Sequence, residues 1–193
     1  MIDGGNIFRY CISPAVEYVD FRPENIKSGG DDRIYSKERI VVRQIGSYPE
    51  GALCPPKLLT LNTIYNIYLD NERFNIKYIL AVINSKAIHF YWLKRFYDNK
   101  KTFPKIKKQP LESIPVRDIP AKEQAPIVRL VDEIHAAKRR DPKANTGRLE
   151  GEIDWMVYGL YGLTKDEVDI VEASIENQTV QSSRTLSSPA ASL

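Results

Sequence analysis

The chain has 193 residues, which is long enough for one domain with a hydrophobic core and an appendage. Hydrophobic residues make up 42% and charged residues 27% of the sequence, as in ordinary globular proteins, and the formal net charge is only +3. This near-balance excludes a uniformly basic chain. It still permits a basic face, because binding to a polyelectrolyte depends on where the charge lies.

Cysteine content and the pattern at the N-terminus favour a cytoplasmic protein. Cys11 and Cys54 are the only cysteines, too few for a disulfide framework in a chain of this length. The sequence has no basic start that leads into an apolar stretch, so we expect no signal peptide. Because strand-like sequence begins within a few residues of Met1, we expect the chain to be a piece of a larger protein.

The first third of the chain predicts β-structure. Strand-like sequence occurs at residues 6–12, 15–21, 39–46 and 58–70. The clearest strand is RIVVRQIG, which is short, β-branched and stopped by Gly46. Segments rich in glycine, proline and acidic residues at 27–32 and 47–57 are expected to be connections.

Helical periodicity begins at Ile76 and predicts one long helix that is buried on more than one side. From Ala121 two further apolar stripes predict helices, and a short last helix is expected to end near Ile175. The serine-rich remainder cannot bury enough apolar surface to offset its ordering entropy, so we expect it to be disordered. The sequence therefore predicts an α+β fold with three parts. Residues 1–118 form a β-rich body with one long buried helix, residues 119–175 a C-terminal helical segment, and residues 176–193 a disordered tail.

Catalytic and metal-binding motifs are not expected in this chain. The segment CPPK has the shape of the Asn/Asp-Pro-Pro-aromatic motif of amino-methyltransferases, but Cys54 and Lys57 cannot bind an amine and stack on a base. No glycine-rich nucleotide loop occurs, and His89 and His135 lie on separate predicted helices without metal-ligand spacing. Acids near lysines could belong to a nuclease, but such strings are common by chance in a charged chain.

A basic run with interleaved aromatic and proline residues is the strongest local feature. Its cations could contact a phosphate backbone, and its aromatic side chains could anchor the loop or stack on a base. The alternative is a solvated surface whose aromatic residues enter the core. The candidate DNA-binding residues in this run are Lys94, Arg95, Lys100, Lys101, Phe103, Lys105, Lys107 and Lys108.

A second candidate follows the clearest strand. Arg43 and Gln44 are residue types that pair bidentately with guanine and adenine edges. The alternative is that both are exposed polar residues at a strand end.

Taken together, three stretches resemble the C-terminal specificity domain of TaqI-like and Eco57I-like N6-adenine DNA methyltransferases. This family includes fused type II restriction-modification enzymes. The three stretches are RIVVRQIG, KYILAVINSKAIHFYW and FPKIKKQPLESIPV. GGNIFRYCI resembles the strand that leads into that domain, and EIDWMVYGLYGLTKDEVDIVE resembles the helical tail of many of these proteins. The resemblance covers most of residues 4–175.

The resemblance implies a target-recognition domain that reads a short duplex sequence and presents an adenine to a separate methyltransferase domain. That other domain would bind S-adenosylmethionine and flip the base. We therefore expect no catalysis and no cofactor in this chain, which would be the recognition part of an adenine-N6 methyltransferase with or without an endonuclease. The expected partners are double-stranded DNA and the methyltransferase domain of the parent chain. The alternative is a protein-interaction module that assembles restriction-modification subunits, favoured by the amphipathic tail and the modest net charge.

Overall fold

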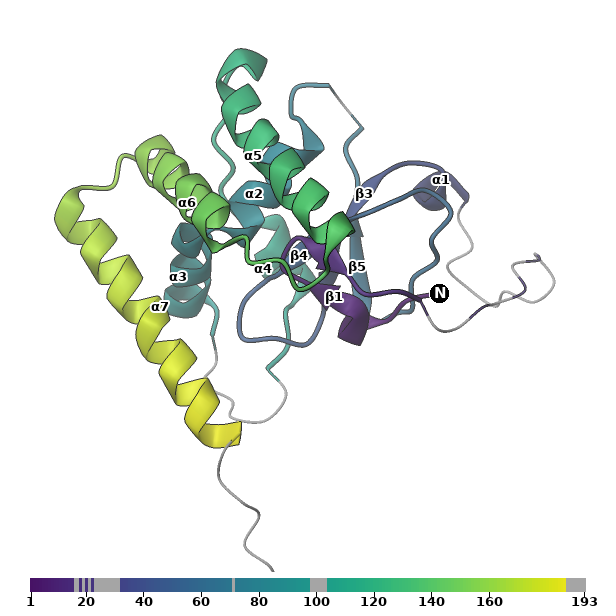
Figure 1. Ribbon diagram of the computed structural model, residues 1–193, viewed down its shortest axis with the longest axis horizontal. Coiled ribbons are helices and arrows are strands. Elements are labelled where there is room, and N and C mark those ends of the chain that lie inside the picture. Colours follow the sequence, from purple (N-terminus) through teal and green to yellow (C-terminus); the bar gives the residue numbers. More distant parts are fainter. Residues whose placement is uncertain are drawn as a thin grey trace, which may run out of the picture.

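The computed structural model describes residues 1–15, 18, 20, 22, 32–70, 72–97 and 104–186, and it has two small antiparallel sheets packed with helices (Figure 1). The predicted α+β class is confirmed. The elements in chain order are η1 (Gly4–Asn6), β1 (Ile7–Phe8), β2 (Cys11–Ile12), α1 (Asp32–Tyr35), β3 (Arg39–Arg43), β4 (Gly51–Cys54), β5 (Ile64–Ile67), α2 (Ile76–Asn84), α3 (Lys86–Arg95), α4 (Lys108–Glu112), α5 (Ala121–Arg140), α6 (Gly147–Tyr161) and α7 (Lys165–Leu186).

The larger sheet has the order β4-β3-β5, and β3 is its central strand. Both faces of β3 are covered, which accounts for its unbroken β-branched sequence. Ile40 and Val42 belong to the main hydrophobic core, whereas Val41 belongs to a smaller core on the other face together with Ile7. The predicted strand is thus confirmed for Arg39–Arg43.

Strand β4 lies in the segment that the sequence predicted to be a loop. The Asn84 side chain pairs with both backbone groups of Gly51, accepting from its N–H at 2.9 Å and donating to its carbonyl at 3.0 Å. A Cβ at position 51 would lie 3.1 Å from Ile40 Cγ2, so glycine is needed for this close packing. A side chain on a helix therefore satisfies part of the strand edge, which no local pattern predicts.

The first predicted strand is a hairpin of two short strands. Ile7 pairs with Ile12 and Phe8 with Cys11, and the chain reverses at Tyr10, whose φ is 61°. Most of the predicted strand at residues 15–21 lies outside the described residues.

The predicted long buried helix is two helices, α2 and α3, which meet at Ser85. Ser85 has φ −70° and ψ 150°, and its hydroxyl accepts a hydrogen bond from the Ile88 N–H at 3.3 Å. The Asp154 carboxylate accepts from the Lys86 N–H at 2.8 Å. These two acceptors satisfy the free N–H groups at the start of α3, so a new helix begins where the apolar periodicity alone predicts continuation.

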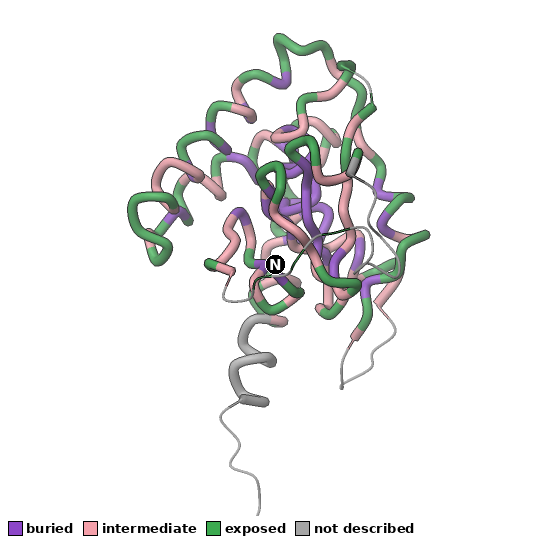
Figure 2. The backbone as a smooth tube through the Cα atoms, turned by 90° about the vertical axis from the view of Figure 1, so that its right-hand side faces the viewer, coloured by how far each residue is buried: buried purple, intermediate pink, exposed green. Residues whose placement is uncertain are grey.

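Each C-terminal helix packs on at least one other helix. Helix α5 packs on α2, α6 packs on α5, and α7 packs on α3 along the outer edge of the molecule (Figure 1). The main hydrophobic core includes Val42 from β3 as well as Ile134 and Val157 from this segment, so the core contains residues from before and after residue 118. The buried backbone gathers at the centre of the molecule (Figure 2).

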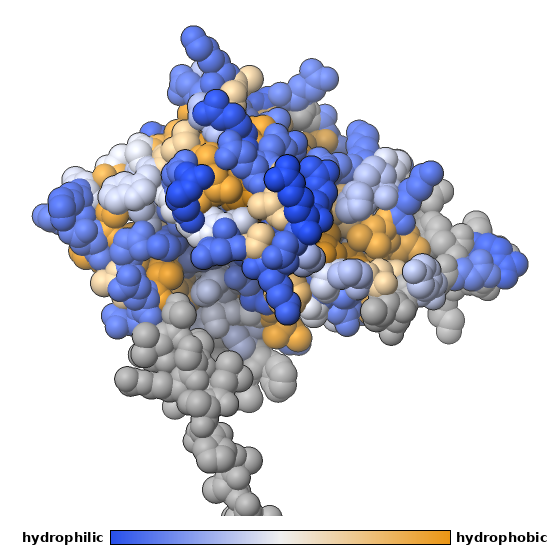
Figure 3. Space-filling model, viewed as in Figure 1, coloured by the Kyte–Doolittle hydropathy of each residue, from blue (hydrophilic) through white to orange (hydrophobic). Residues whose placement is uncertain are grey.

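The last helix extends beyond its predicted end. Gly162, with φ 68°, ends α6, and the paired side chains of Thr164 and Glu167 begin α7, which continues to Leu186 rather than to Ile175. Among the described helices, none is long and apolar enough to cross a membrane. Hydrophilic side chains cover much of the face in Figure 3, with small hydrophobic patches between them.

Candidate nucleic-acid interface

The two predicted contact regions lie against each other. Ile45 and Lys105 form an antiparallel bridge, the Gly46 N–H donates to the Pro104 carbonyl at 2.9 Å, and the Ile106 N–H donates to the Gln44 carbonyl at 2.8 Å. The basic run therefore continues the sheet beyond the end of β3. The sequence predicted the two regions separately, and the fold brings them together.

Ile106 anchors the basic run. Its side chain is buried, whereas its neighbours Lys105 and Lys107 are exposed, as expected for an extended segment whose side chains alternate. The Tyr65 hydroxyl donates to the Ile106 carbonyl at 3.1 Å and fixes the segment further. The two lysines are thus presented to solvent from a backbone held in one register.

The other candidate cations occupy helix ends. Lys94 and Arg95 are exposed in the last turn of α3, and the Lys94 ammonium lies 5.3 Å from the centre of the Phe90 ring. Lys108 begins α4 and pairs with Glu112 at 3.6 Å, but both side chains are well exposed and such a pair contributes little. The predicted contacts Lys100, Lys101 and Phe103 lie outside the described residues.

Arg43 is already engaged within the protein. Its guanidinium forms an ion pair with Glu50, and its side chain is 29% exposed. A Cβ at position 46 would lie 3.2 Å from Arg43 Nε, so Gly46 leaves room for the guanidinium against the turn. A contact from Arg43 to a base edge would have to be made by the N–H groups that Glu50 does not use.

Gln44 joins the strand end to a neighbouring turn. Its backbone N–H donates to the Thr63 carbonyl at 2.9 Å, and its side-chain Nε2 donates to the Asn62 carbonyl at 2.8 Å. This turn brings Leu61 and Asn62, both exposed, beside the end of β3. Neither residue stands out in the sequence, because residues 58–70 have a continuous strand-like pattern that gives no sign of the turn.

We call this composite face the strand-end surface. It combines the end of β3, the turn before β5 and the anchored part of the basic run. Its members are Gln44, Ile45, Leu61, Asn62, Lys105 and Lys107.

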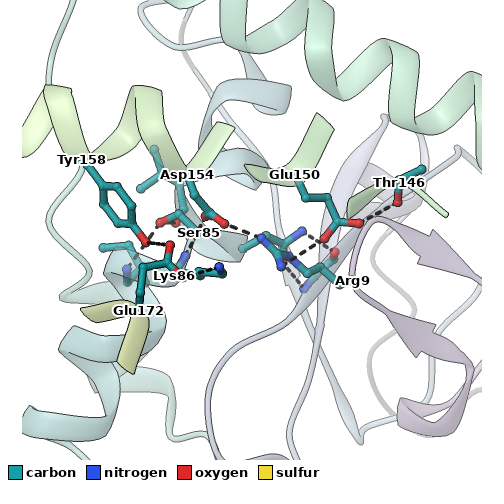
Figure 4. A network of polar contacts seen from close by, with 12 residues as sticks. Arg9, Ser85, Lys86, Thr146, Glu150, Asp154, Tyr158 and Glu172 are labelled. Atoms are coloured by element: carbon teal, nitrogen blue, oxygen red, sulfur yellow. Dashed lines mark hydrogen bonds and ion pairs between the residues drawn. The ribbon is translucent and has the colours of Figure 1, made fainter. Parts of the chain in front are cut away.

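A partly buried polar network connects the N-terminal hairpin to α6 and α7 (Figure 4). Arg9 Nη1 lies 3.0 Å from Glu150 Oε2, and Arg9 Nη2 lies 3.6 Å from Asp154 Oδ1. Burial raises the pKa of the Asp154 carboxyl, and Arg9 opposes that shift. On the other side, Glu172 pairs with Lys86 at 2.5 Å and accepts from the Tyr158 hydroxyl at 2.8 Å. Each of these side chains pairs within the protein, although Arg9 Nε and Asp154 Oδ2 are buried without a hydrogen-bond partner among the described residues.

The two histidines lie on separate helices, His89 on α3 and His135 on α5. His89 is buried and stacks on Tyr48 at 4.1 Å between ring centres. Burial, with a further contribution from Arg9, holds the pKa of His89 well below its ordinary value, so the ring is neutral. In the part of the chain that the structure describes, no three acidic, histidine or cysteine side chains could hold a metal ion.

Comparison with known proteins places these observations in a family. No curated protein matches the sequence. The family model for the TaqI-like C-terminal specificity domain matches residues 1–116, which is more than half of the chain. That range contains β1 through α4 and the whole strand-end surface, and it ends before the helices α5 to α7. The chain therefore belongs to the family of TaqI-like C-terminal specificity domains.

Proposed function

We propose that this chain recognises a specific sequence in double-stranded DNA, and that the strand-end surface is its contact face. The observation that carries the proposal is the bridge between Ile45 and Lys105. This bridge joins a cationic segment to the end of a rigid central strand in a chain that belongs to a specificity-domain family.

Residues of the strand-end surface, together with the adjacent Arg43 and Lys108, have two different roles in the proposal. Lys105 and Lys107, together with Lys108 on α4, contact phosphates, which gives affinity for any sequence. Arg43 and Gln44 contact base edges, which gives preference for one sequence. The anchoring of Ile106 supports these two roles. Because the backbone that carries the phosphate-binding lysines is held in one register, phosphate contacts would place the end of β3 at a fixed position along the groove.

We further propose that the chain has no catalytic activity of its own. It works in a restriction-modification protein whose separate methyltransferase part binds S-adenosylmethionine and methylates adenine at N6. Membership in the specificity-domain family supports a linked methyltransferase. The carboxylates of Glu150, Asp154 and Glu172 support a non-catalytic role, because each pairs with a cation or accepts a hydrogen bond within the protein.

The proposal is tested by binding of the 193-residue chain to fluorescent duplex DNA at low salt. The double variant Lys105→Ala/Lys107→Ala should bind every duplex more weakly. The matched control is Lys165→Ala, which removes an exposed lysine on α7 and should leave affinity unchanged. Equal binding by the double variant and the wild type would refute the assignment of this face and favour the protein-interaction role.

A further inference from the structure

The turn before β5 carries an asparagine side chain whose presence the fold does not explain. The Ile64 N–H donates to the Leu61 carbonyl at 3.3 Å, which makes Asn62 and Thr63 the central residues of a β-turn. Asparagine is favoured in turns because its side chain usually bonds to the nearby backbone. The Asn62 side chain is exposed and has no hydrogen-bond partner within the described ranges. Its amide is therefore free to contact a ligand.

The backbone of this turn is held on both sides. The Leu61 N–H donates to the Ile2 carbonyl at 2.9 Å, and the Thr63 hydroxyl accepts from the Gly4 N–H at 3.1 Å. The carbonyls of Asn62 and Thr63 both accept from Gln44. A side chain on an anchored backbone loses little further freedom on binding, so the free amide is well placed to make an oriented contact.

Exposed aliphatic side chains belong to the sequence neighbours of Gln44 and Asn62. Ile45 is 48% exposed and Leu61 is 37% exposed, and both flank residues that the Gln44 hydrogen bonds hold together. Ile45 also faces Lys105 in the bridge, so this residue is next to Gln44 in the sequence and opposite a lysine of the basic run. An exposed amide and exposed aliphatic groups are thus combined at the end of β3.

This combination matches one base pair. In the major groove, adenine offers the N7 acceptor and the N6 donor, which an asparagine amide can contact together, and thymine offers a methyl group. A G·C pair has no methyl group, and its guanine offers two acceptors rather than an acceptor and a donor. The strand-end surface therefore complements an A·T pair better than a G·C pair.

We infer that Asn62 reads the adenine of an A·T pair and that Ile45 contacts the methyl group of its thymine. The inference rests on the proposed DNA-recognition function and extends it to a residue that the sequence pattern did not single out. The inference also assigns more of the sequence preference to the turn than to Arg43 and Gln44. Glu50 already engages the Arg43 guanidinium, and the Gln44 amide already donates to the Asn62 carbonyl. Of Arg43, Gln44 and Asn62, it is Asn62 whose side-chain amide uses neither its donor nor its acceptor among the described residues.

Selection from a pool of randomised duplexes tests the adenine contact. The wild-type chain should enrich a motif with at least one strong A·T position. Asn62→Ala should reduce the preference at one such position by about tenfold or more while the other positions keep theirs. The matched control is Asn177→Ala, which removes an exposed asparagine on α7 and should leave the motif unchanged. A melting curve for each variant establishes that it is folded.

The outcomes separate the inference from the function on which it rests. If Asn62→Ala selects the same motif with the same strength as the wild type, Asn62 does not read a base and the inference fails, while DNA recognition stands. If the wild type selects no motif, the proposed function fails and the inference falls with it.

Uracil substitution tests the methyl contact independently. Replacing the thymine of the selected A·T pair with uracil removes only the methyl group. The wild type should lose affinity severalfold, whereas Ile45→Ala should bind both duplexes equally. Equal binding of the two duplexes by the wild type would contradict the role of Ile45.

Discussion

Arg9 and Glu150 form an ion pair, with 3.0 Å between Nη1 and Oε2, across the junction between the N-terminal hairpin and α6. Arg9 lies in the part of the chain that the family model matches, and Glu150 lies outside it. Asp154 adds a second carboxylate on the same side, 3.6 Å from Arg9 Nη2. The helical segment is therefore joined to the recognition part by charge as well as by the shared hydrophobic core.

Removing the cation of this junction should destabilise the whole chain. Arg9→Met leaves Glu150 and Asp154 without their shared partner, and we expect the free energy of unfolding to fall by about 2–4 kcal/mol. The matched control is Arg148→Met on α6, whose pair with Glu152 is exposed and worth less than about 1 kcal/mol. Urea denaturation of the two variants measures the difference. Equal losses would mean that the Arg9 junction does not contribute to stability.

Stability should also fall as the solution becomes mildly acidic. Burial holds the pKa of His89 well below the ordinary value of 6.5. Below pH 6.5, the unfolded chain therefore binds a proton at His89 that the folded chain does not bind. The stabilising contribution of the neutral ring is complete above about pH 6.5 and is lost at about 1.4 kcal/mol per pH unit as the pH falls toward the folded pKa.

Urea unfolding between pH 7 and 5 measures this slope, and a matched pair of variants assigns it. His89→Phe should flatten the slope. His135→Phe should retain most of it, because the pKa of His135 is lowered less strongly by partial burial and the neighbouring Lys77. A slope that survives His89→Phe unchanged would show that another group is responsible.

The end of α7 should contribute little to stability although its backbone is helical to Leu186. Among the described side chains of α7, Val168 and Val171 in its first half are buried, and Glu172 pairs with Lys86. Deleting residues 176–193 should leave Tm unchanged within error, whereas Val171→Ala should lower it by several degrees, at about 2–4 °C per kcal/mol lost. A clear fall in Tm after the deletion would mean that the tail docks on the protein.

The chain should not transfer methyl groups by itself. Incubation with duplex DNA and labelled S-adenosylmethionine should give no incorporation above a control without protein. Adding the methyltransferase part of the parent protein should restore incorporation. Activity of the chain alone would contradict its assignment as a recognition part.

Local sequence patterns predicted those helices and strands that are determined by residues close together in the sequence. The β-branched run of β3, the apolar stripes of α5 and α6, and the helix stop at Gly162 are all visible in short windows. Ser85 is different, because a serine inside an apolar period reads as a tolerated interruption until Asp154 is known to lie at the start of α3. Strand β4 depends in the same way on the Asn84 side chain.

The candidate site likewise has features that local sequence predicted and features that depend on contacts between distant residues. Composition predicted the basic run, and residue type predicted Arg43 and Gln44. Their association through Ile45 and Lys105 depends on pairing between residues far apart in the sequence. The engagement of Arg43 by Glu50 and the free amide of Asn62 depend on side-chain geometry, which no pattern of residue types specifies.

The most direct measurement of the central claim is the salt dependence of duplex binding by the wild type, Lys105→Ala and the control Lys165→Ala. We predict that the logarithm of the association constant falls linearly with the logarithm of salt concentration for all three proteins. The slope for Lys105→Ala should be smaller by about one unit, equally for every duplex sequence, because one phosphate contact and its counterion release are lost. A slope for Lys105→Ala equal to that of the wild type, or wild-type binding that does not respond to salt, would contradict the account.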